Sequence, residues 1–183
     1  AWYSVGAEFA AGRPGTSKLQ VAEESIVSTE LVTFRGKKFQ DVRTARNRAG
    51  KEGIRAVWTT WNDAGTMIRS QIRALSEEWV SDKSLPEMGF TLGNLSTLHD
   101  PEVRLMLALD EHDNLHGVTS WLPVYEDGAL AGWMLDFMRR DPAGFRPVVE
   151  FLIAETLVQA HEDGLGWISL SGAPLAHEAS GEE

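Results

Sequence analysis

The fold is decided by Gly117-Val-Thr-Ser-Trp-Leu-Pro-Val-Tyr-Glu-Asp-Gly-Ala-Leu-Ala-Gly-Trp-Met-Leu-Asp136, in which two apolar runs flank an Asp-Gly pair. An Asp-Gly pair between apolar runs is typical of a tight hairpin turn, so the runs are predicted to pair as antiparallel strands. The second run leads into Leu135-Asp-Phe-Met-Arg-Arg, which brings a carboxylate and two guanidinium groups to the end of a strand. We therefore look for chemistry at this end of the hairpin.

The residues after the hairpin indicate a helix and a returning strand. Residues 145–162 are long and apolar enough for a helix, and Trp167-Ile-Ser-Leu-Ser reads as a strand. The order strand, strand, helix, strand predicts an α/β or α+β sheet with at least one crossover helix. The helix also carries a second apolar stripe, Phe151, Ala154 and Val158, which we expect a companion domain or partner to cover.

The residues before the hairpin alternate between predicted strands and helices. Residues 18–32 form one strand or two short ones, with a helix as the alternative, and their expected core residues are Val21, Ile26 and Val27. Residues 36–50 are predicted to be a helix, 54–59 a strand, 84–96 a loop and 103–110 a strand. A second helix is expected after an N-cap at Asn62 or Asp63. Its core-facing stripe is Ile68, Ile72, Leu75 and Trp79.

Composition fits an ordinary globular chain of 183 residues, with 43% hydrophobic and 24% charged residues. We expect a leading segment at 1–17, one domain at 18–176 that ends early, and a tail at 177–183. No run approaches the roughly 20 apolar residues of a membrane-spanning helix, so this piece is predicted to be soluble. The absence of cysteine excludes a disulfide, a thiol nucleophile and a cysteine zinc site. The histidine spacing favours neither a metal site nor a serine triad, and no phosphate-binding P-loop motif occurs.

The net charge of −10 is unevenly distributed. Residues 35–55 hold eight basic and two acidic residues, a net of +6, so the remainder carries −16. Within the helix predicted there, Arg43, Asn47 and Lys51 project away from the apolar face. This segregation allows one face to meet an anionic partner although the chain as a whole is acidic.

Three arginines, Arg139, Arg140 and Arg146, lie around the turn between the second hairpin strand and the following helix. The free N–H groups and the dipole of a helix N-terminus favour anions, so this turn is a candidate phosphate site. For Asp136 and Glu150 two interpretations remain open. They either form structural ion pairs with these arginines, or they bind an ammonium group or accept a proton.

The last predicted strand ends in Ser171-Gly-Ala-Pro. A backbone turn is the favoured interpretation because Gly and Pro mark turns. A loop that lines a binding cleft is the alternative.

Six blocks of this sequence, in order, resemble the catalytic domain of aminoacyl-phosphatidylglycerol synthases, the phosphatidylglycerol lysyl- and alanyltransferases. They are Phe34-Arg-Gly-Lys-Lys-Phe-Gln-Asp-Val-Arg-Thr-Ala-Arg-Asn-Arg-Ala, Gly89-Phe-Thr-Leu-Gly, Thr119-Ser-Trp-Leu-Pro-Val-Tyr, Leu135-Asp-Phe-Met-Arg-Arg, Val149-Glu-Phe-Leu and Leu170-Ser-Gly-Ala-Pro-Leu. The resemblance covers about residues 18–176. It implies a GNAT-like acyltransferase fold, with a central, mostly antiparallel sheet flanked by helices.

The resemblance also implies a reaction: transfer of a lysyl or alanyl group from aminoacyl-tRNA to a hydroxyl of phosphatidylglycerol, without metal or acetyl-CoA. The parent would be a membrane protein with a companion GNAT-like domain, working at the cytoplasmic face of the membrane. We assign catalytic roles to Asp136, Glu150 and Arg139. The expected substrate-binding residues are Arg43, Asn47, Lys51, Phe90, Ser120, Arg140 and Ser171.

Two other functions are compatible with the same sequence. The first is a GNAT-fold acyltransferase with a soluble acceptor and an acyl-CoA or aminoacyl-tRNA donor. The turn Arg140-Asp-Pro-Ala-Gly-Phe lacks the pyrophosphate-binding pattern expected for CoA, which disfavours the CoA version. The second is a non-catalytic module that docks on tRNA or on anionic membrane through its basic helix.

Overall fold

The computed structural model describes residues 22–83 and 94–174. Their six strands form one sheet in the order β1-β6-β5-β4-β3-β2. The strands are β1 Ala22–Ser28, β2 Arg55–Thr59, β3 Arg104–Leu109, β4 Leu115–Glu126, β5 Ala129–Arg140 and β6 Trp167–Pro174. The helices are α2 Gln40–Lys51, α3 Thr66–Lys83 and α4 Val148–Glu162, with short 3-10 turns η1 Thr29–Thr33, η2 Lys37–Phe39 and η3 Leu95–His99.

Contacts divide the chain into two units. The first is Ile26–Ser171, and the second combines Ala1–Ser25 with Gly172–Glu183. Most of the second unit lies outside the described residues, as do the predicted leading segment 1–17 and tail 177–183, so the following description concerns Ile26–Ser171.

The hairpin predicted from the Asp-Gly pair is confirmed. Glu126 pairs with Ala129, and the two residues between them, Asp127 and Gly128, have positive φ angles of 50° and 78°. A two-residue turn with both φ angles positive matches the twist of antiparallel strands. Among the strand pairs whose register the described residues define, β2–β3, β3–β4 and β4–β5 are antiparallel and β5–β6 is parallel, which agrees with the mostly antiparallel α/β sheet we expected.

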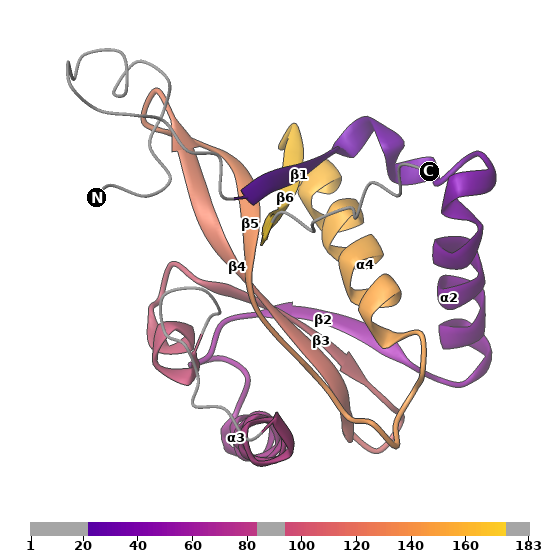
Figure 1. Cartoon of the computed structure of the whole chain (residues 1–183), viewed down its shortest axis with the longest axis vertical. Coiled ribbons are helices and arrows are strands. Elements are labelled where there is room, and N and C mark those ends of the chain that lie inside the picture. Colours follow the sequence, from indigo (N-terminus) through magenta and orange to yellow (C-terminus); the bar gives the residue numbers. More distant parts are fainter. Residues whose placement is uncertain (1–21, 84–93, 175–183) are drawn as a thin grey trace, which may run out of the picture. The chain divides into compact units, whose positions relative to one another are not determined.

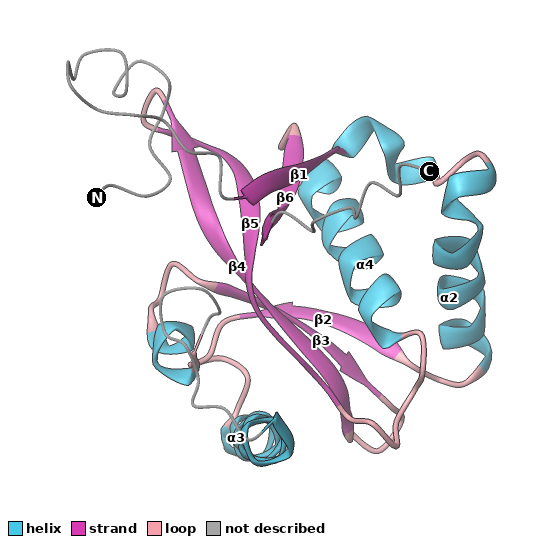
Figure 2. Cartoon of the chain, in the orientation of Figure 1, coloured by secondary structure: helices cyan, strands magenta, loops and turns pink. Residues whose placement is uncertain are grey.

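Helices cover both faces of this sheet (Figure 1 and Figure 2). On one face α4 packs on β2, β3, β4 and β5, and α2 packs beside α4. The core of this face includes Trp121, Trp133, Leu152 and Ile168. On the other face α3 contacts β4 and β5, and the core includes Ile72, Leu98 and Phe137. No described helix has the combination of length and apolarity needed to cross a bilayer.

The second apolar stripe of α4 needs no outside partner. Phe151 is 4% exposed and Ala154 is 2% exposed, and Val158 packs on the same core. Helix α2 and η1 lie against α4 and cover the stripe, and Arg46 on α2 contacts Glu155 on α4 at 2.7 Å. The expectation of a companion on this face was wrong because a preceding helix of the same chain occupies it.

Several local predictions also need correction. The described part of residues 18–32 contains strand β1, as one of the predicted options had it, followed by the 3-10 turn η1, but Ile26 is 58% exposed and not in the core. Helix α3 begins at Thr66, after Gly65 with φ 84°, so neither Asn62 nor Asp63 is its N-cap. Val21, Phe90 and most of the predicted 84–96 loop lie outside the described residues, and nothing of the Trp79 side chain is described.

Candidate functional site

The candidate site lies where β5 and β6 stop pairing. Their parallel register covers only Gly132 with Trp167, Trp133 with Ile168 and Met134 with Ser169. Gly132 permits this approach, since a Cβ there would lie 2.6 Å from the Trp167 carbonyl oxygen and 2.7 Å from its indole ring. Within the described residues, β5 beyond Met134 is paired on its β4 side only.

Ser171 bonds β6 to β5 just beyond the last residue pair of the two strands. Its φ is 66°, and its hydroxyl donates a hydrogen bond to the Leu135 carbonyl. Strand β6 continues to Pro174, so the turn favoured for Ser171-Gly-Ala-Pro was wrong. On the side away from β4, residues 136–140 of β5 therefore have no strand partner among the described residues, and we call this side the open edge.

A β-bulge sits at the start of this open edge. Thr119 pairs with Met138 and Trp121 with Leu135, so Asp136 and Phe137 together lie opposite the single residue Ser120. The Phe137 N–H donates to Ser120 Oγ at 3.0 Å. Bulges re-aim side chains and occur often beside active sites.

The bulge turns Asp136 and Phe137 to the same side of the sheet. Phe137 packs in the α3-side core, and Asp136 accepts a hydrogen bond from Thr97 Oγ1 of η3 at 3.2 Å. Burial raises the pKa of the half-buried Asp136 carboxyl, and the Thr97 bond opposes that rise. Among the described residues neither Asp136 nor Glu150 makes an ion pair, so the structural ion-pair interpretation has no support there.

Arg139 lies on the same side as Asp136 and is only 4% exposed. One of its guanidinium nitrogens donates to the Met138 carbonyl at 2.8 Å, and the guanidinium carbon lies 4.3 Å from the Phe137 ring centroid. The packing on the ring fixes the direction of the charge. Arg139 is thus a buried part of the strand rather than a solvent-exposed anion contact.

The other predicted residues of this region do not join Asp136 and Arg139. Arg140 is exposed at the end of β5, and Met138 is 40% exposed in the same open stretch. Glu150 is exposed in the first turn of α4, the helix that covers the opposite face of the sheet. Ser120 is fully buried and serves the bulge, so direct substrate contact through its hydroxyl is wrong for this conformation.

The basic helix α2 is largely occupied by contacts within the chain. Arg43 donates to the carbonyls of Phe34 and Gly36, the latter at 2.8 Å, and holds the turn before the helix. Three further arginines of the basic stretch are in ion pairs, namely Arg46 with Glu155, Arg48 with Glu52 and Arg55 with Asp113. Asn47 and Lys51 are exposed, so of the three predicted contacts on this helix these two face solvent.

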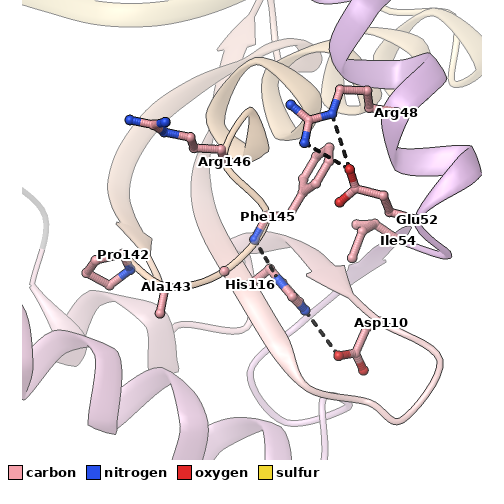
Figure 3. Close-up of a pocket in the computed structure, with 10 residues that line it drawn as sticks. Arg48, Glu52, Ile54, Asp110, His116, Pro142, Ala143, Phe145 and Arg146 are labelled. Atoms are coloured by element: carbon pink, nitrogen blue, oxygen red, sulfur yellow. Dashed lines mark hydrogen bonds and ion pairs between the residues drawn. The ribbon is translucent and has the colours of Figure 1, made fainter.

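A second feature, which sequence reasoning missed, is a hollow of about 640 Å³ between the end of α2 and the turn into α4 (Figure 3). Two arginines, Arg48 and Arg146, and two carboxylates, Glu52 and Asp110, line it, so its charges balance. At its floor His116 contacts Asp110 at 3.1 Å. The sequence signal for this pair was Asp110 at the start of a turn, six residues before His116, but neither residue had a motif around it.

Comparisons with known proteins show which family this chain is similar to. The family model described as "Phosphatidylglycerol lysyltransferase, C-terminal" matches residues 1–183. An uncharacterised protein of Corynebacterium glutamicum is 57% identical over 178 residues, which are 96% of this chain and 22% of that protein. The lysylphosphatidylglycerol biosynthesis bifunctional protein LysX of Nocardia farcinica is 27% identical over 161 residues, 88% of this chain and 14% of that protein.

Solved structures support the fold. L-PGS from Bacillus licheniformis superposes with a TM-score of 0.73 at 21% identity, covering 88% of this chain and 48% of that one. A GCN5-related glucosamine N-acetyltransferase region of a fungal multi-domain protein gives a TM-score of 0.50 at 10% identity, covering 92% of this chain and 20% of that one. The GNAT-like fold is therefore confirmed, and the chain spans at most about a fifth of the curated relatives it matches.

Proposed function

Because the chain belongs to the phosphatidylglycerol lysyltransferase C-terminal family, we propose that it carries the site that transfers a lysyl or alanyl group from aminoacyl-tRNA to a hydroxyl of phosphatidylglycerol. The observation that carries the proposal is the family match over the whole chain. The open edge of β5, with a half-buried carboxylate beside it, is the place in the fold where such a transfer would occur.

The transfer exchanges one ester for another. The lipid hydroxyl oxygen attacks the carbonyl carbon of the aminoacyl ester, and a tetrahedral intermediate forms. Its collapse breaks the bond to the ribose oxygen of the tRNA, and the proton lost by the lipid hydroxyl ends on that oxygen. Since the donor ester is already activated, the protein has to align the hydroxyl and stabilise the oxyanion.

We assign these tasks to residues around the bulge. Asp136 supplies the carboxylate that holds the aminoacyl ammonium group or accepts the hydroxyl proton, and its raised pKa suits proton transfer. The Met138 N–H faces the open edge, because Phe137 and Asp141 direct theirs toward β4, and it donates to the oxyanion. Arg139 adds positive charge on the Asp136 side, held in direction by the Phe137 ring.

Glu150, exposed in the first turn of α4, is the second carboxylate that we assign to the transfer. The exposed side chains available for tRNA or lipid phosphate are Asn47, Lys51, Arg140 and Arg146. Arg43 is excluded from this set because two backbone carbonyls already use its guanidinium. Ser171 shapes the opening through its bond to Leu135 rather than by touching substrate.

The remaining parts of the proposal concern the whole protein. The curated relatives are several times longer than this chain, which leaves room for a companion GNAT-like domain and a membrane domain. We place the site at the cytoplasmic face of the membrane, where aminoacyl-tRNA and phosphatidylglycerol can meet.

The test uses the protein at the full length its gene encodes, labelled lysyl- or alanyl-tRNA and vesicles containing phosphatidylglycerol. Label should appear in the lipid with wild-type protein and be lost with Asp136→Asn, while Asn47→Ala should change mainly the apparent affinity for tRNA. Lipid that stays unlabelled with either aminoacyl-tRNA would refute the proposal. Titration with acetyl-CoA tests the alternative, because micromolar binding would favour a CoA-dependent acyltransferase.

A further inference from the structure

One imidazole joins two turns that are far apart in the sequence. His116 Nε2 lies 3.1 Å from Asp110 Oδ2 at the end of β3, and His116 Nδ1 accepts the Phe145 N–H at 2.8 Å in the turn before α4 (Figure 3). The His116 carbonyl accepts the Asp141 N–H of the same turn at 3.0 Å. Two of the bonds that tie this turn to the sheet therefore come from His116.

These bonds determine the tautomer of the imidazole. The Phe145 N–H is a donor, so His116 Nδ1 has to be the unprotonated acceptor. The proton of the neutral ring is then on Nε2, where Asp110 accepts it. A carboxylate that holds a histidine in one tautomer is the arrangement known from catalytic triads. In this molecule, however, both nitrogens are used and neither is open to a substrate.

The Asp110 carboxylate is itself held firmly. It accepts hydrogen bonds from the backbone N–H groups of His112 and Asn114, both at 2.9 Å, and from the Asn114 side chain at 3.0 Å. The bonds from Asn114, followed by the one from His116, lower the pKa of Asp110 well below the usual range of a carboxyl group. Asp110 thus stays ionised, which keeps the Nε2–H tautomer of His116.

The turn that His116 holds has little freedom to adjust. A Cβ on Gly144 would lie 2.9 Å from His116 Nδ1, so the backbone passes directly over the imidazole. The turn is the only connection between Arg140, the last residue of β5, and α4, whose first turn carries Glu150. Loss of the bond between the imidazole and this turn would therefore shift Arg140 at one end of the turn and the start of α4 at the other.

We propose that His116 and Asp110 are positioning residues for the aminoacyl transfer: by bonding the Phe145 N–H, the imidazole fixes the path of the chain from β5 to α4, and so the placement of Arg140 at the end of β5 and of Glu150 in the first turn of α4. This inference rests on the proposed function. It assigns the dyad no contact with substrate.

Four variants test the tautomer requirement. His116→Asn keeps an acceptor near the position of Nδ1, whereas His116→Leu removes it. Asp110→Asn turns an NH2 group toward Nε2 and so favours the tautomer with a proton on Nδ1, which cannot accept the Phe145 N–H. We expect His116→Leu and Asp110→Asn to lower kcat by about 10- to 100-fold with a smaller change in KM. His116→Asn and the double variant Asp110→Asn/His116→Asn should both transfer close to the wild-type rate.

The double variant separates positioning from general damage. If Asp110→Asn acts only through the histidine tautomer, it should be harmful with His116 present and nearly silent with Asn in its place. An equal loss from Asp110→Asn in both backgrounds would overturn the inference, as would His116→Asn being as slow as His116→Leu. Four variants with unchanged rates would overturn it as well.

Hydrogen exchange at the Phe145 amide keeps this test independent of the transfer assay. Protection should be lost in His116→Leu and Asp110→Asn and retained in His116→Asn. If no protein transfers label but the exchange pattern is as expected, the proposed function fails and the dyad keeps its positioning of the turn. If transfer occurs and the exchange pattern is absent, the dyad inference fails alone.

Discussion

Replacing Ser120 by Ala tests whether the bulge under the candidate site depends on one hydroxyl. Ser120 is fully buried, and its Oγ is the acceptor that the structure gives to the Phe137 N–H, at 3.0 Å. Without the hydroxyl, that buried N–H has no protein acceptor in the described bond network. Leaving a buried donor unsatisfied costs about 1–3 kcal/mol.

The expected loss is large enough to measure by thermal unfolding. In a domain of 150–250 residues, 1 kcal/mol shifts Tm by about 2–4 °C, so Ser120→Ala should lower Tm by roughly 2–12 °C. The lipid-transfer rate should fall further than stability alone explains, because the bulge also orients Asp136 and the Met138 N–H. The assay is therefore unfolding by circular dichroism combined with transfer at a temperature where the variant remains folded.

Thr156→Val is the matched control. Thr156 is also fully buried, but its hydroxyl donates at 2.8 Å to the Leu152 carbonyl, which belongs to the α4 helix and retains its backbone bond when the hydroxyl is removed. This change should cost about 1 kcal/mol or less. If Ser120→Ala is no more destabilising than Thr156→Val, and transfers at the wild-type rate, then the bond to Phe137 does not maintain the bulge and the reasoning is refuted.

Three further outcomes are expected. Burial raises the pKa of Asp136 above its value in the unfolded chain, so this carboxyl lowers the stability of the fold once the pH is above both values. Asp136→Asn should therefore increase Tm at neutral pH, remove that part of the pH dependence of stability, and abolish transfer. A decrease in Tm would contradict the burial argument. Gly132→Ala should strongly destabilise the protein, because the new Cβ would lie 2.6 Å from a backbone oxygen. Gly50→Ala, whose Cβ would have nothing within 4 Å, should stabilise helix α2 by about 0.5–1 kcal/mol. Denaturant titrations that rank the two variants otherwise would refute the close approach of β6 to Gly132. Lys51→Glu should lower the salt slope of tRNA binding by about one unit and leave Tm unchanged. Arg43→Ala should lower Tm instead, because the Arg43 guanidinium holds the turn before α2. Equal effects of the two variants in filter binding and in thermal unfolding would reject the assignment of Lys51 to tRNA and Arg43 to the fold.

The parts of the fold that sequence predicted well are those set by local patterns. An Asp-Gly pair between apolar runs was enough for the β4–β5 hairpin, because the positive φ angles of Asp127 and Gly128 are a local property. The α4 helix and the strand after it followed from apolar spacing in the same way. The cover over Phe151 was not predictable, since it depends on α2, more than a hundred residues earlier in the chain.

Charge counting predicted the location of the basic surface but not its availability. Arg43 and Lys51 lie eight residues apart, just over two helical turns, and look equivalent in the sequence. In the structure the Arg43 guanidinium donates hydrogen bonds to two carbonyls of the preceding turn, while Lys51 is exposed. The two carbonyls belong to Phe34 and Gly36, whose φ angles of 49° and 96° are a local conformation that no spacing rule indicates.

The candidate site exists because β5 departs from the regular pattern that allowed it to be recognised as a strand. Strict alternation would put Asp136 and Phe137 on opposite faces of the sheet. The bulge opposite Ser120 instead directs both to the α3 side, and this same displacement turns the Met138 N–H to the edge that β6 has left. A carboxylate and a backbone donor therefore flank one opening, although an ideal strand would not place them there. The part of β5 before this bulge packs Trp133 in the α4-side core, and the bulge with the residues after it supplies the groups we assign to the transfer.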